Sequence, residues 1–359
     1  MQRTALLCLA SMALGCSTDL EINAPYQDIT IVHGLLNMRD SIQYIKVNKA
    51  FLGEGDALVY AQIQDSNEWQ PDAITYAKVF RRLNGAIVDS FPLYDTLLTN
   101  REPGVFHAPE QTVHYFKDSF RDQVLQNGIP TTMYLDEESD YALELMVKGQ
   151  RINATTNVVN DFSFQAADQS LTIPVNLMDG SDYGGFELNW SSDLDGKRYE
   201  AKYRFNYREV RGTDTTGILS FSQRITNVVN PGTGGGISMA GLMEGELFFS
   251  TLVNRIPADP TVDKRIFMGL DFIVSVANDE FHTFLTLSEP VSGIIEDRPS
   301  YTNINNGYGI FASRYDKFIL NKGLGGTTLA ELVDGPITAQ LRFCTGRADD
   351  VNSPHYCAP

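Results

Sequence analysis

Basic residues, tryptophan, histidine and cysteine are all scarce in this 359-residue sequence, and each shortage narrows what the protein can be. The sequence has 28 lysines and arginines against 45 aspartates and glutamates, which gives a formal net charge of −17. Because excess negative charge repels phosphate backbones, we expect no nucleic acid partner. The histidines stand in separate segments without the spacing of metal ligands, so we expect no metal and no other cofactor. They are His33, His107, His114, His282 and His355.

A complete catalytic motif is also missing. The run Gly236–Ala240 is similar to a nucleophile elbow, but alanine stands where the last glycine belongs, so we interpret Ser238 as a turn residue. Asp193–Gly196 has two carboxylates at calcium-type spacing, but the basic residues after it depart from that pattern, and we predict a hairpin there. The acidic run Asp136–Asp140 is interpreted as a solvated loop. We therefore expect no catalytic residues and no enzyme.

No apolar run reaches the ~20 residues that a membrane-spanning helix needs. Ala5–Leu14 is a shorter apolar run after a basic N-terminus, and Gly15 closes it, a pattern typical of an export signal. Because a cysteine follows this small residue, we predict cleavage before Cys16 and acylation of its thiol, as in bacterial lipoproteins. Residues 1–15 are then the signal peptide, and residues 16–28 form a lipidated tether. An ordinary secretory signal is the alternative.

The cysteines divide between this signal and the C-terminal end of the chain. Cys8 leaves with the signal and Cys16 carries the lipid, which leaves Cys344 and Cys357 in an oxidising compartment. We predict a disulfide between these two, and closing a loop of this length stabilises a fold by roughly 3 kcal/mol. Two unpaired thiols or a metal pair are the alternatives, with His355 as the nearby additional ligand.

Alternating apolar and polar residues predict a mainly β fold. Tyr141–Lys148 places its apolar residues on one face, and Asn84-Gly85 is a strong hairpin signal between two strands. About seven short strands over residues 29–165 predict an N-terminal immunoglobulin-like β-sandwich. Within this region we expect one short helix over Asp118–Asn127, with a capping residue at its start and Gly128 at its end.

Residues 166–359 are predicted to form a second antiparallel β domain with a few short helices and the C-terminal disulfide loop. The polar stretch Asp161–Ser170 marks the junction between the two domains. Strands are expected over Leu171–Val175 and Tyr199–Val210, and the second alternates for about ten residues. Apolar residues at helical spacing predict two helices, Glu246–Ile256 and Asp279–Ser288.

One run near the C-terminus carries a family resemblance. Tyr301–Arg314 is similar to a signature of the domain-of-unknown-function 4249 family, whose members are outer-membrane lipoproteins of Bacteroidota. Val32–Leu36 and Lys46–Gly55 resemble the opening strands of that family, and the likeness covers most of the mature chain. Within the signature, Asn306-Gly307 suits a tight turn, and Gly309 allows another backbone to approach closely.

Such lipoproteins are commonly encoded beside TonB-dependent outer-membrane transporters. The resemblance therefore implies an integral outer-membrane β-barrel as partner, attachment to the membrane through the N-terminal lipid, and a position facing the cell exterior. We expect a non-enzymatic accessory or binding subunit of a TonB-dependent transporter. A structural subunit of a larger outer-membrane assembly or secretion machine and a surface hydrolase are the alternatives. Three short motifs resemble O-glycosylation sites of these bacteria, Asp40-Ser41-Ile42, Asp95-Thr96-Leu97 and Asp214-Thr215-Thr216.

Overall fold

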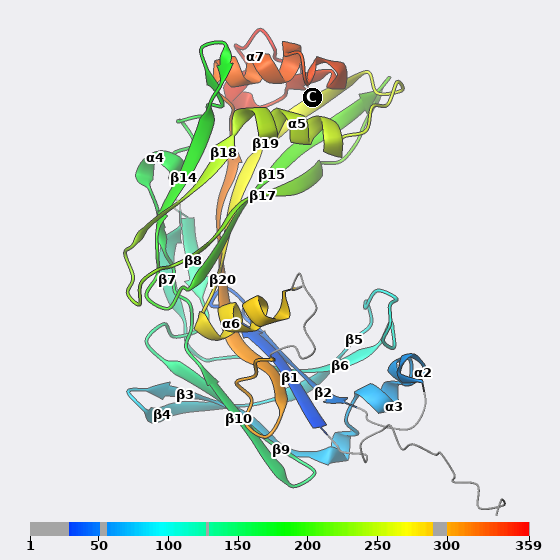
Figure 1. Ribbon diagram of the computed structural model, residues 1–359, viewed down its shortest axis with the longest axis vertical. Helices are drawn as coiled ribbons and strands as arrows, with labels where there is room; N and C mark the ends of the chain where they lie inside the picture. Colours follow the sequence, from blue (N-terminus) through cyan, green and yellow to red (C-terminus); the bar gives the residue numbers. More distant parts are fainter. Residues whose placement is uncertain (1–28, 51–55, 127–128, 290–299, 359) are drawn as a thin grey trace, which may run out of the picture.

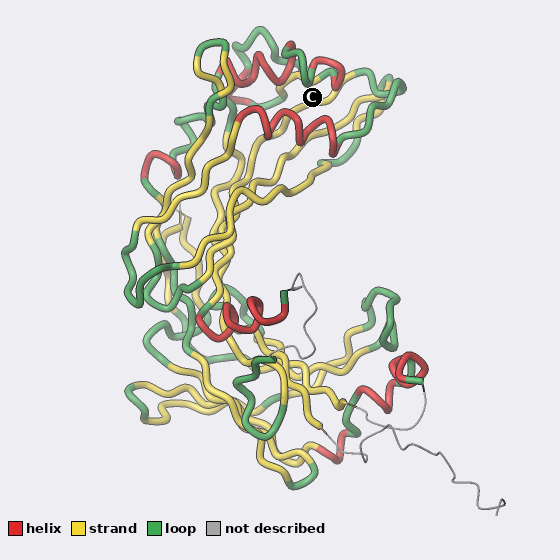
Figure 2. The backbone as a smooth tube through the Cα atoms, in the orientation of Figure 1, coloured by secondary structure: helices red, strands yellow, loops and turns green. Residues whose placement is uncertain are grey.

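The protein is mainly β, with 49% of residues in strands and 16% in helices. The computed structural model describes residues 29–50, 56–126, 129–289 and 300–358. The predicted fold class, mainly β with a few short helices, is confirmed. Figure 2 shows strands running along most of the molecule, with helices gathered toward its ends and one helix near its middle.

The largest sheet has ten strands, of which β15, β17, β19 and β20 run along the long axis of the molecule (Figure 1). Its main path runs β16–β15–β19–β20–β1–β2–β6–β5, while β17 pairs with β15, and β21 with β19. In chain order these strands are β1 (Ile29–Leu36), β2 (Gln43–Ala50), β5 (Tyr94–Leu98), β6 (Gln111–Phe116), β15 (Arg198–Arg211), β16 (Asp214–Thr215), β17 (Leu219–Val229), β19 (Lys264–Ala277), β20 (Tyr308–Lys322) and β21 (Phe343–Thr345).

The parallel pair β1–β20 joins the first and the last long strands of the chain. Ile31 pairs with Tyr308, and the register continues to Leu36 and its partner in β20. Gly309 has a φ of +104°, and a Cβ on this residue would overlap the carbonyl oxygen of Val32. Glycine is therefore required where the two backbones meet. Strands on both sides of the predicted 165/166 boundary share this sheet, and the boundary itself stays a prediction.

Four smaller sheets complete the β structure. One has the order β10–β9–β3–β4, one has the order β11–β14–β18, and two are the hairpins β12–β13 and β7–β8. Their bounds are β3 (Ile74–Leu83), β4 (Ala86–Pro92), β7 (Asp122–Gln126), β8 (Ile129–Met133), β9 (Asp140–Val147), β10 (Gln150–Thr156), β11 (Ser163–Phe164), β12 (Met178–Asp179), β13 (Asp182–Tyr183), β14 (Gly185–Ser191) and β18 (Ser238–Glu244).

Period-two burial explains how these sheets pack. In β9, Tyr141, Leu143, Leu145 and Val147 are all buried, as their alternation predicts. In β15, residues from Tyr199 to Tyr207 alternate between buried and half-buried positions. The predicted hairpin at Asn84-Gly85 is confirmed, because both residues have positive φ and the flanking strands β3 and β4 pair.

The described helices are short. Their bounds are α2 (Ala57–Ala61), α3 (Gln64–Asn67), α4 (Ala166–Gln169), α5 (Gly245–Arg255), α6 (Asp279–Ser288) and α7 (Gly326–Asp334), with 3-10 turns η1 (Pro71–Ala73), η2 (Ala339–Leu341) and η3 (Ala348–Asp350). The two predicted helices are confirmed as α5 and α6. Phe248 of α5 packs 5.4 Å from the ring of Tyr203 in β15, which seats this helix on the large sheet.

Two predicted elements are wrong. Asp118–Asn127 is not a helix, because Asp122–Gln126 forms β7 and pairs with β8. The carboxylate of Asp118 accepts hydrogen bonds from Tyr141 and from the guanidinium group of Arg81, so it fixes a loop instead of capping a helix. Leu171–Val175 is a turn and not a strand; of its residues only Val175 makes a β-bridge, to Leu324. Its proline has no N–H to donate to a strand partner.

Candidate functional site

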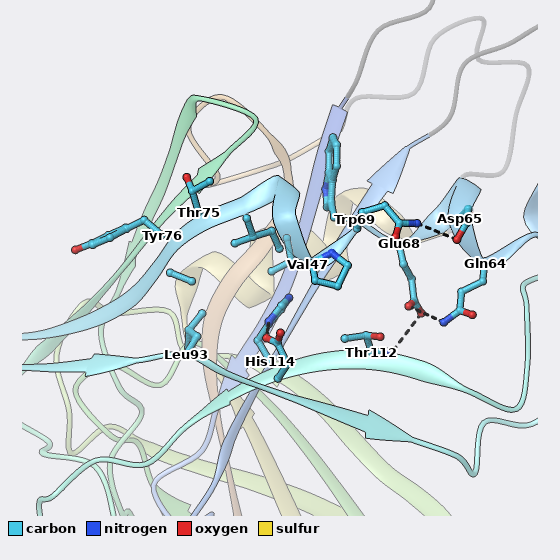
Figure 3. Close-up of a pocket in the computed structure, with 15 residues that line it drawn as sticks. Val47, Gln64, Asp65, Glu68, Trp69, Thr75, Tyr76, Leu93, Thr112 and His114 are labelled. Carbon is cyan, nitrogen blue, oxygen red and sulfur yellow. Dashed lines mark hydrogen bonds and ion pairs between the residues drawn. The ribbon is translucent and has the colours of Figure 1, made fainter.

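An open cleft of about 420 Å³ lies where α3 and the start of β3 face the strands β2, β6 and β5 (Figure 3). Its walls carry two aromatic residues, Trp69 and Tyr76, and apolar Val47 and Leu93. The rest of the lining is largely polar. The polar side chains are Gln64, Asp65, Glu68, Gln70, Thr75, Asp95, Thr112 and His114.

Strand alternation and register bring His114 and Asp95 together in this cleft. His114 of β6 lies directly opposite Asp95 of β5, and its Nδ1 is 2.6 Å from the Asp95 carboxylate. The imidazole is buried, while the carboxylate side chain is 61% exposed. Because an ionised carboxylate can only accept, the hydrogen between them belongs to Nδ1. In the neutral ring this leaves the lone pair on Nε2.

Glu68 joins the helical wall to the sheet wall. Its Oε1 accepts the backbone N–H of Thr112 at 3.2 Å, and its Oε2 accepts the side-chain amide of Gln64 at 3.0 Å. The backbone of Glu68 also makes a β-bridge to Asn48 in β2. On the rim, the Gln70 amide donates to Asp65 at 3.0 Å. These bonds hold the carboxylates of the cleft in fixed positions, as Figure 3 shows.

Trp69 is anchored next to these residues. Its indole N–H donates to the carbonyl oxygen of Asn48 at 3.0 Å. The ammonium groups of Lys49 and Lys148 lie 5.7 Å and 5.3 Å from the indole ring, within the range of a cation–π interaction. The hydrogen bond of Trp69 therefore holds the residues after α3 against β2. Because Glu68 is the preceding residue, its position is fixed as well.

The charge of the lining selects the kind of molecule that fits. Among its fifteen residues are three carboxylates, Asp65, Glu68 and Asp95, and neither lysine nor arginine. A lining with an excess of carboxylates favours ligands of the opposite sign, and the ammonium groups of Lys49 and Lys148 beside Trp69 offset part of this charge. The lining therefore suits cationic or neutral molecules that donate hydrogen bonds, and it disfavours phosphates and carboxylates.

A hydrolytic mechanism would need a nucleophile beside His114. The lining contains the hydroxyl groups of Thr75, Tyr76 and Thr112. Across residues 29–50, 56–126, 129–289 and 300–358, the hydrogen bond of the His114 side chain is to Asp95 and none reaches a hydroxyl group. A histidine oriented by a carboxylate is two members of a triad. His114 and Asp95 therefore supply two of the three groups of such a set.

The structure places the predicted special residues away from this cleft. Cys344 and Cys357 form a disulfide with their Cα atoms 5.9 Å apart, at the C-terminal end of the molecule. Cys16, the predicted lipidation site, lies outside the described residues. Ser238 is the first residue of β18 and pairs with Ser191, so its interpretation as a turn residue is wrong. The ladder of β14 and β18 begins at this pair and holds Ser238 in extended backbone.

The other histidines do not gather into one site. His33 and His282 both have lowered pKa values, because burial disfavours the protonated ring and nearby cations oppose it further. His355 lies 3.5 Å from the carboxylate of Asp334, and the backbone N–H of His107 donates to Ala61. Within the described part of the chain, no group of three or more histidine, cysteine or acidic residues is placed to hold a metal.

The predicted hairpin at Asp193–Gly196 is also wrong, because this loop leads from β14 to β15, which belong to different sheets. The Asp193 carboxylate accepts the backbone N–H groups of Asn160 and Asp195 at 3.0 and 3.1 Å. Burial raises the pKa values of both aspartates. Asp136–Ser139 is a loop as predicted, with exposed glutamates, whereas Asp140 begins β9.

The cleft itself escaped the sequence analysis. His114 appeared there as one of five isolated histidines, and Asp95 appeared as part of a possible glycosylation motif. The signal that could have indicated it is Trp69, one of two tryptophans in the chain, with acidic and amide residues on both sides of it. Such a cluster of aromatic and planar polar side chains is typical of a ligand site.

No helix in the described parts of the chain is long and apolar enough to cross a membrane. Comparison with known proteins adds no relative: neither a protein-family model nor a curated protein matches this chain.

Proposed function

We propose that this protein is an outer-membrane lipoprotein, acylated on Cys16 and facing the cell exterior, that serves as a non-enzymatic binding subunit of a TonB-dependent transporter. The anchor rests on the signal pattern before Cys16, and the partner barrel rests on the resemblance of Tyr301–Arg314 to its family. The observation that carries the binding role is the acidic cleft beside Trp69. It is open, and hydrogen bonds hold its carboxylates in place.

The cargo class follows from the chemistry of the cleft. Asp65, Glu68 and Asp95 offer carboxylate acceptors, and Gln64 and Thr112 add neutral polar groups. A small solute rich in hydrogen-bond donors, cationic or neutral, satisfies these acceptors best. Anionic solutes would leave the carboxylates unpaired and repelled. The subunit would thus present donor-rich solutes to the transporter.

The partnership is tested by affinity purification from detergent-solubilised outer membranes. We expect an integral β-barrel to be recovered with the protein in a fixed ratio. The chain with Cys16→Ser is the matched control, because it keeps the folded body and loses the predicted acylation site. Recovery of the wild-type lipoprotein without a barrel would contradict the proposal. Recovery of several partners at fixed stoichiometry would favour the structural subunit of a larger assembly.

The binding role is tested on the cleft directly. A panel of amines and neutral sugars is screened by thermal shift, and the best ligand is titrated by calorimetry. Asp95→Asn keeps the shape of the side chain but removes its charge, so the affinity for an amine should fall by roughly tenfold. Asp349→Asn, an exposed aspartate at the other end of the molecule, is the control and should leave binding unchanged. Equal loss in both variants would argue against the cleft.

A surface hydrolase is the second candidate, and the His114–Asp95 pair is the observation that favours it. If the protein hydrolyses a bond in the cleft, His114→Asn should abolish turnover while the melting temperature stays close to that of the wild type. Thr112→Val distinguishes a nucleophile on the same strand from an external water. Turnover that survives His114→Asn would exclude this role for the pair.

A further inference from the structure

Five apolar side chains are exposed together at one corner of the molecule. They come from α2, the residue directly before α3, and the loop between β5 and β6, and each is between 45% and 63% exposed. We call this group the apolar tip; its members are Leu58, Val59, Ile63, Val105 and Phe106. Soluble proteins rarely expose a contiguous apolar group without a partner for it.

Hydrogen bonds connect the two segments that form the apolar tip. The side-chain amide of Gln62 donates to the carbonyl oxygens of Gly104 at 3.0 Å and Val105 at 2.6 Å. The backbone N–H of His107 donates to Ala61 at 2.9 Å. These bonds join α2 to the β5–β6 loop, so the exposed side chains are held in place before any partner arrives.

A buried amide fixes the apolar tip to the cleft. Asn67, at the end of α3, donates through Nδ2 to the carbonyl oxygens of Ala61 and Ile63, both at 2.8 Å. The next residue, Glu68, is part of the cleft lining. The orientation of the apolar tip and the orientation of the cleft are therefore coupled through one short helix.

The apolar tip lies near the point where the described chain begins. Ile29, its first residue, pairs with Ala50 at the end of β2, and Ile31 pairs with Asn48. Asn48 in turn makes the β-bridge to Glu68, directly after α3. In Figure 1 the start of β1, α2 and α3 lie at the same end of the molecule. A lipid on Cys16 would thus hold this end closest to the membrane, through a tether of a dozen residues.

The residue types of the apolar tip favour a lipid bilayer over a protein as its binding partner. Protein interfaces depend on tryptophan, tyrosine and arginine anchors. The apolar tip has four aliphatic side chains and one phenylalanine, and the guanidinium group of Arg101 lies 5.5 Å from the Phe106 ring. Acidic Asp56, Asp65 and Glu102 are its neighbours in sequence, so attraction to anionic headgroups is not its basis. Protruding aliphatic groups on a short helix and a loop suit insertion among neutral lipids.

We infer that the apolar tip is a bilayer contact, which inserts its five side chains at the membrane surface beside the lipid anchor. This inference rests on the proposed anchoring at Cys16. The tether alone would let the body rotate, whereas a second contact fixes its orientation. Because Asn67 couples the apolar tip to Glu68, the cleft is then held at a constant angle and height above the bilayer.

The experiment measures membrane depth with a fluorophore. The mature chain from position 16 onward, with Cys16→Ser and a histidine tag in place of residues 1–15, is held on phosphatidylcholine vesicles that contain a nickel-chelating lipid. A nitrobenzoxadiazole label is attached through Val59→Cys, while the native C-terminal cysteines stay paired in their disulfide. A matched chain carries the label through Val351→Cys, which is similarly exposed at the opposite end of the molecule.

We expect the emission of the label at position 59 to shift to the blue on vesicles and to be quenched by brominated lipid. The label at position 351 should show neither change. Adding Leu58→Glu and Phe106→Glu should lower the quenching at position 59 at least about threefold, because charged groups leave the acyl region. Added salt should have little effect, since the contact is apolar.

Three results would overturn the inference. One is equal emission at positions 59 and 351 on vesicles. Another is a blue shift that appears without vesicles and grows with protein concentration, which would assign the apolar tip to a second copy of the chain. The third is a blue shift at infinite dilution without lipid, which would mean that another segment of this chain covers it. Because the nickel lipid replaces the acyl group, a failed anchor at Cys16 is detected separately, by mass spectrometry of the native N-terminus.

Discussion

Gly309 shows how a single residue can decide whether two distant strands meet. A Cβ at this position would overlap the Val32 carbonyl, and the φ of +104° is itself unfavourable for any other residue. We therefore expect Gly309→Ala to lower the free energy of unfolding by about 3 kcal/mol or more, measured by urea denaturation.

Gly149→Ala is the matched control for this change. Gly149 also has a positive φ, of +77°, but a Cβ there would meet no atom within 4 Å. Its cost should therefore be limited to the backbone conformation, about 1 kcal/mol. If both variants lose the same stability, the close approach of β1 and β20 is not what makes Gly309 necessary.

A second residue-scale prediction concerns Tyr141. Its hydroxyl donates to the buried carboxylate of Asp118 at 2.5 Å and accepts the backbone N–H of Asp136 at 3.0 Å. Burial raises the pKa of Tyr141, and the negative charge of Asp118 raises it further, so the phenol keeps its proton at neutral and mildly alkaline pH. Tyr141→Phe should cost about 2 kcal/mol in urea denaturation, because two buried polar groups lose a partner.

Tyr94→Phe serves as the comparison, since Tyr94 is an exposed residue of β5. Its effect should stay within about 0.5 kcal/mol. A Tyr141→Phe variant as stable as Tyr94→Phe would mean that water or another donor replaces the lost hydroxyl at Asp118.

Only some of the site residues could be predicted from the sequence. The cysteine pair could be proposed from counting and compartment alone. His114 and Asp95 could not, because their contact depends on the register of β5 against β6, and a shift of one residue would turn them to opposite faces. Neither residue carries a local pattern that marks its partner.

Among the elements, α6 carries the clearest pH-dependent feature. The Asn278 side chain caps the helix by accepting from Phe281 at 3.1 Å, and it donates to the Glu280 carboxylate at 2.6 Å. Burial raises the pKa of Glu280, and the negative charges of Asp279 and Asp195 add to the shift. The folded state therefore favours the protonated carboxyl, and ionisation of Glu280 lowers stability as the pH rises through its folded pKa.

Glu280→Gln should thus raise the melting temperature at pH 7, because a neutral amide accepts the same hydrogen bond without the repulsion. The gain should disappear at acidic pH, below the ordinary glutamate pKa of 4.5, where the wild-type carboxyl is protonated in both states. Scanning calorimetry at a series of pH values measures both. Glu187→Gln on β14, an exposed carboxylate, is the control and should show no such convergence. A destabilised Glu280→Gln variant at pH 7 would contradict the sign of the shift.

At this scale, period and length explain which predictions held. The helices α5 and α6 follow continuous apolar spacing over ten or more residues, and β15 alternates from Arg198 to Glu209. The helix predicted over Asp118–Asn127 is wrong because Asp118 accepts hydrogen bonds in a loop. The residues after it form the first strand of a short hairpin. Signals of four or five residues do not separate a helical turn from a hairpin strand.

For the whole molecule, the ten-stranded sheet predicts coupled unfolding. Two domains with separate sheets could melt independently, but β20 pairs with β19 on one side and β1 on the other. Calorimetry should therefore show one transition whose van't Hoff and calorimetric enthalpies agree. In Gly309→Ala, which damages the β1–β20 seam, the transition should broaden or divide. Two resolved transitions in the wild type would show that the seam does not couple the halves.

The mainly β class was predictable from alternation, whereas this seam was not. Ile31 and Tyr308 are separated by nearly the entire chain, and no local pattern identifies which distant strand a parallel partner will be. The sequence therefore predicts two consecutive β regions, while the structure links them through the last long strand.

The pairing of β1 with β20 cannot form until β20 has been synthesised. β1 is synthesised well before β20, its parallel neighbour in the sheet. Until β20 arrives, one edge of β1 has an unsatisfied backbone and an apolar surface, and such delayed pairing slows folding and invites aggregation. A holding chaperone during synthesis or passage across a membrane would therefore protect this protein more than one whose sheets close in order.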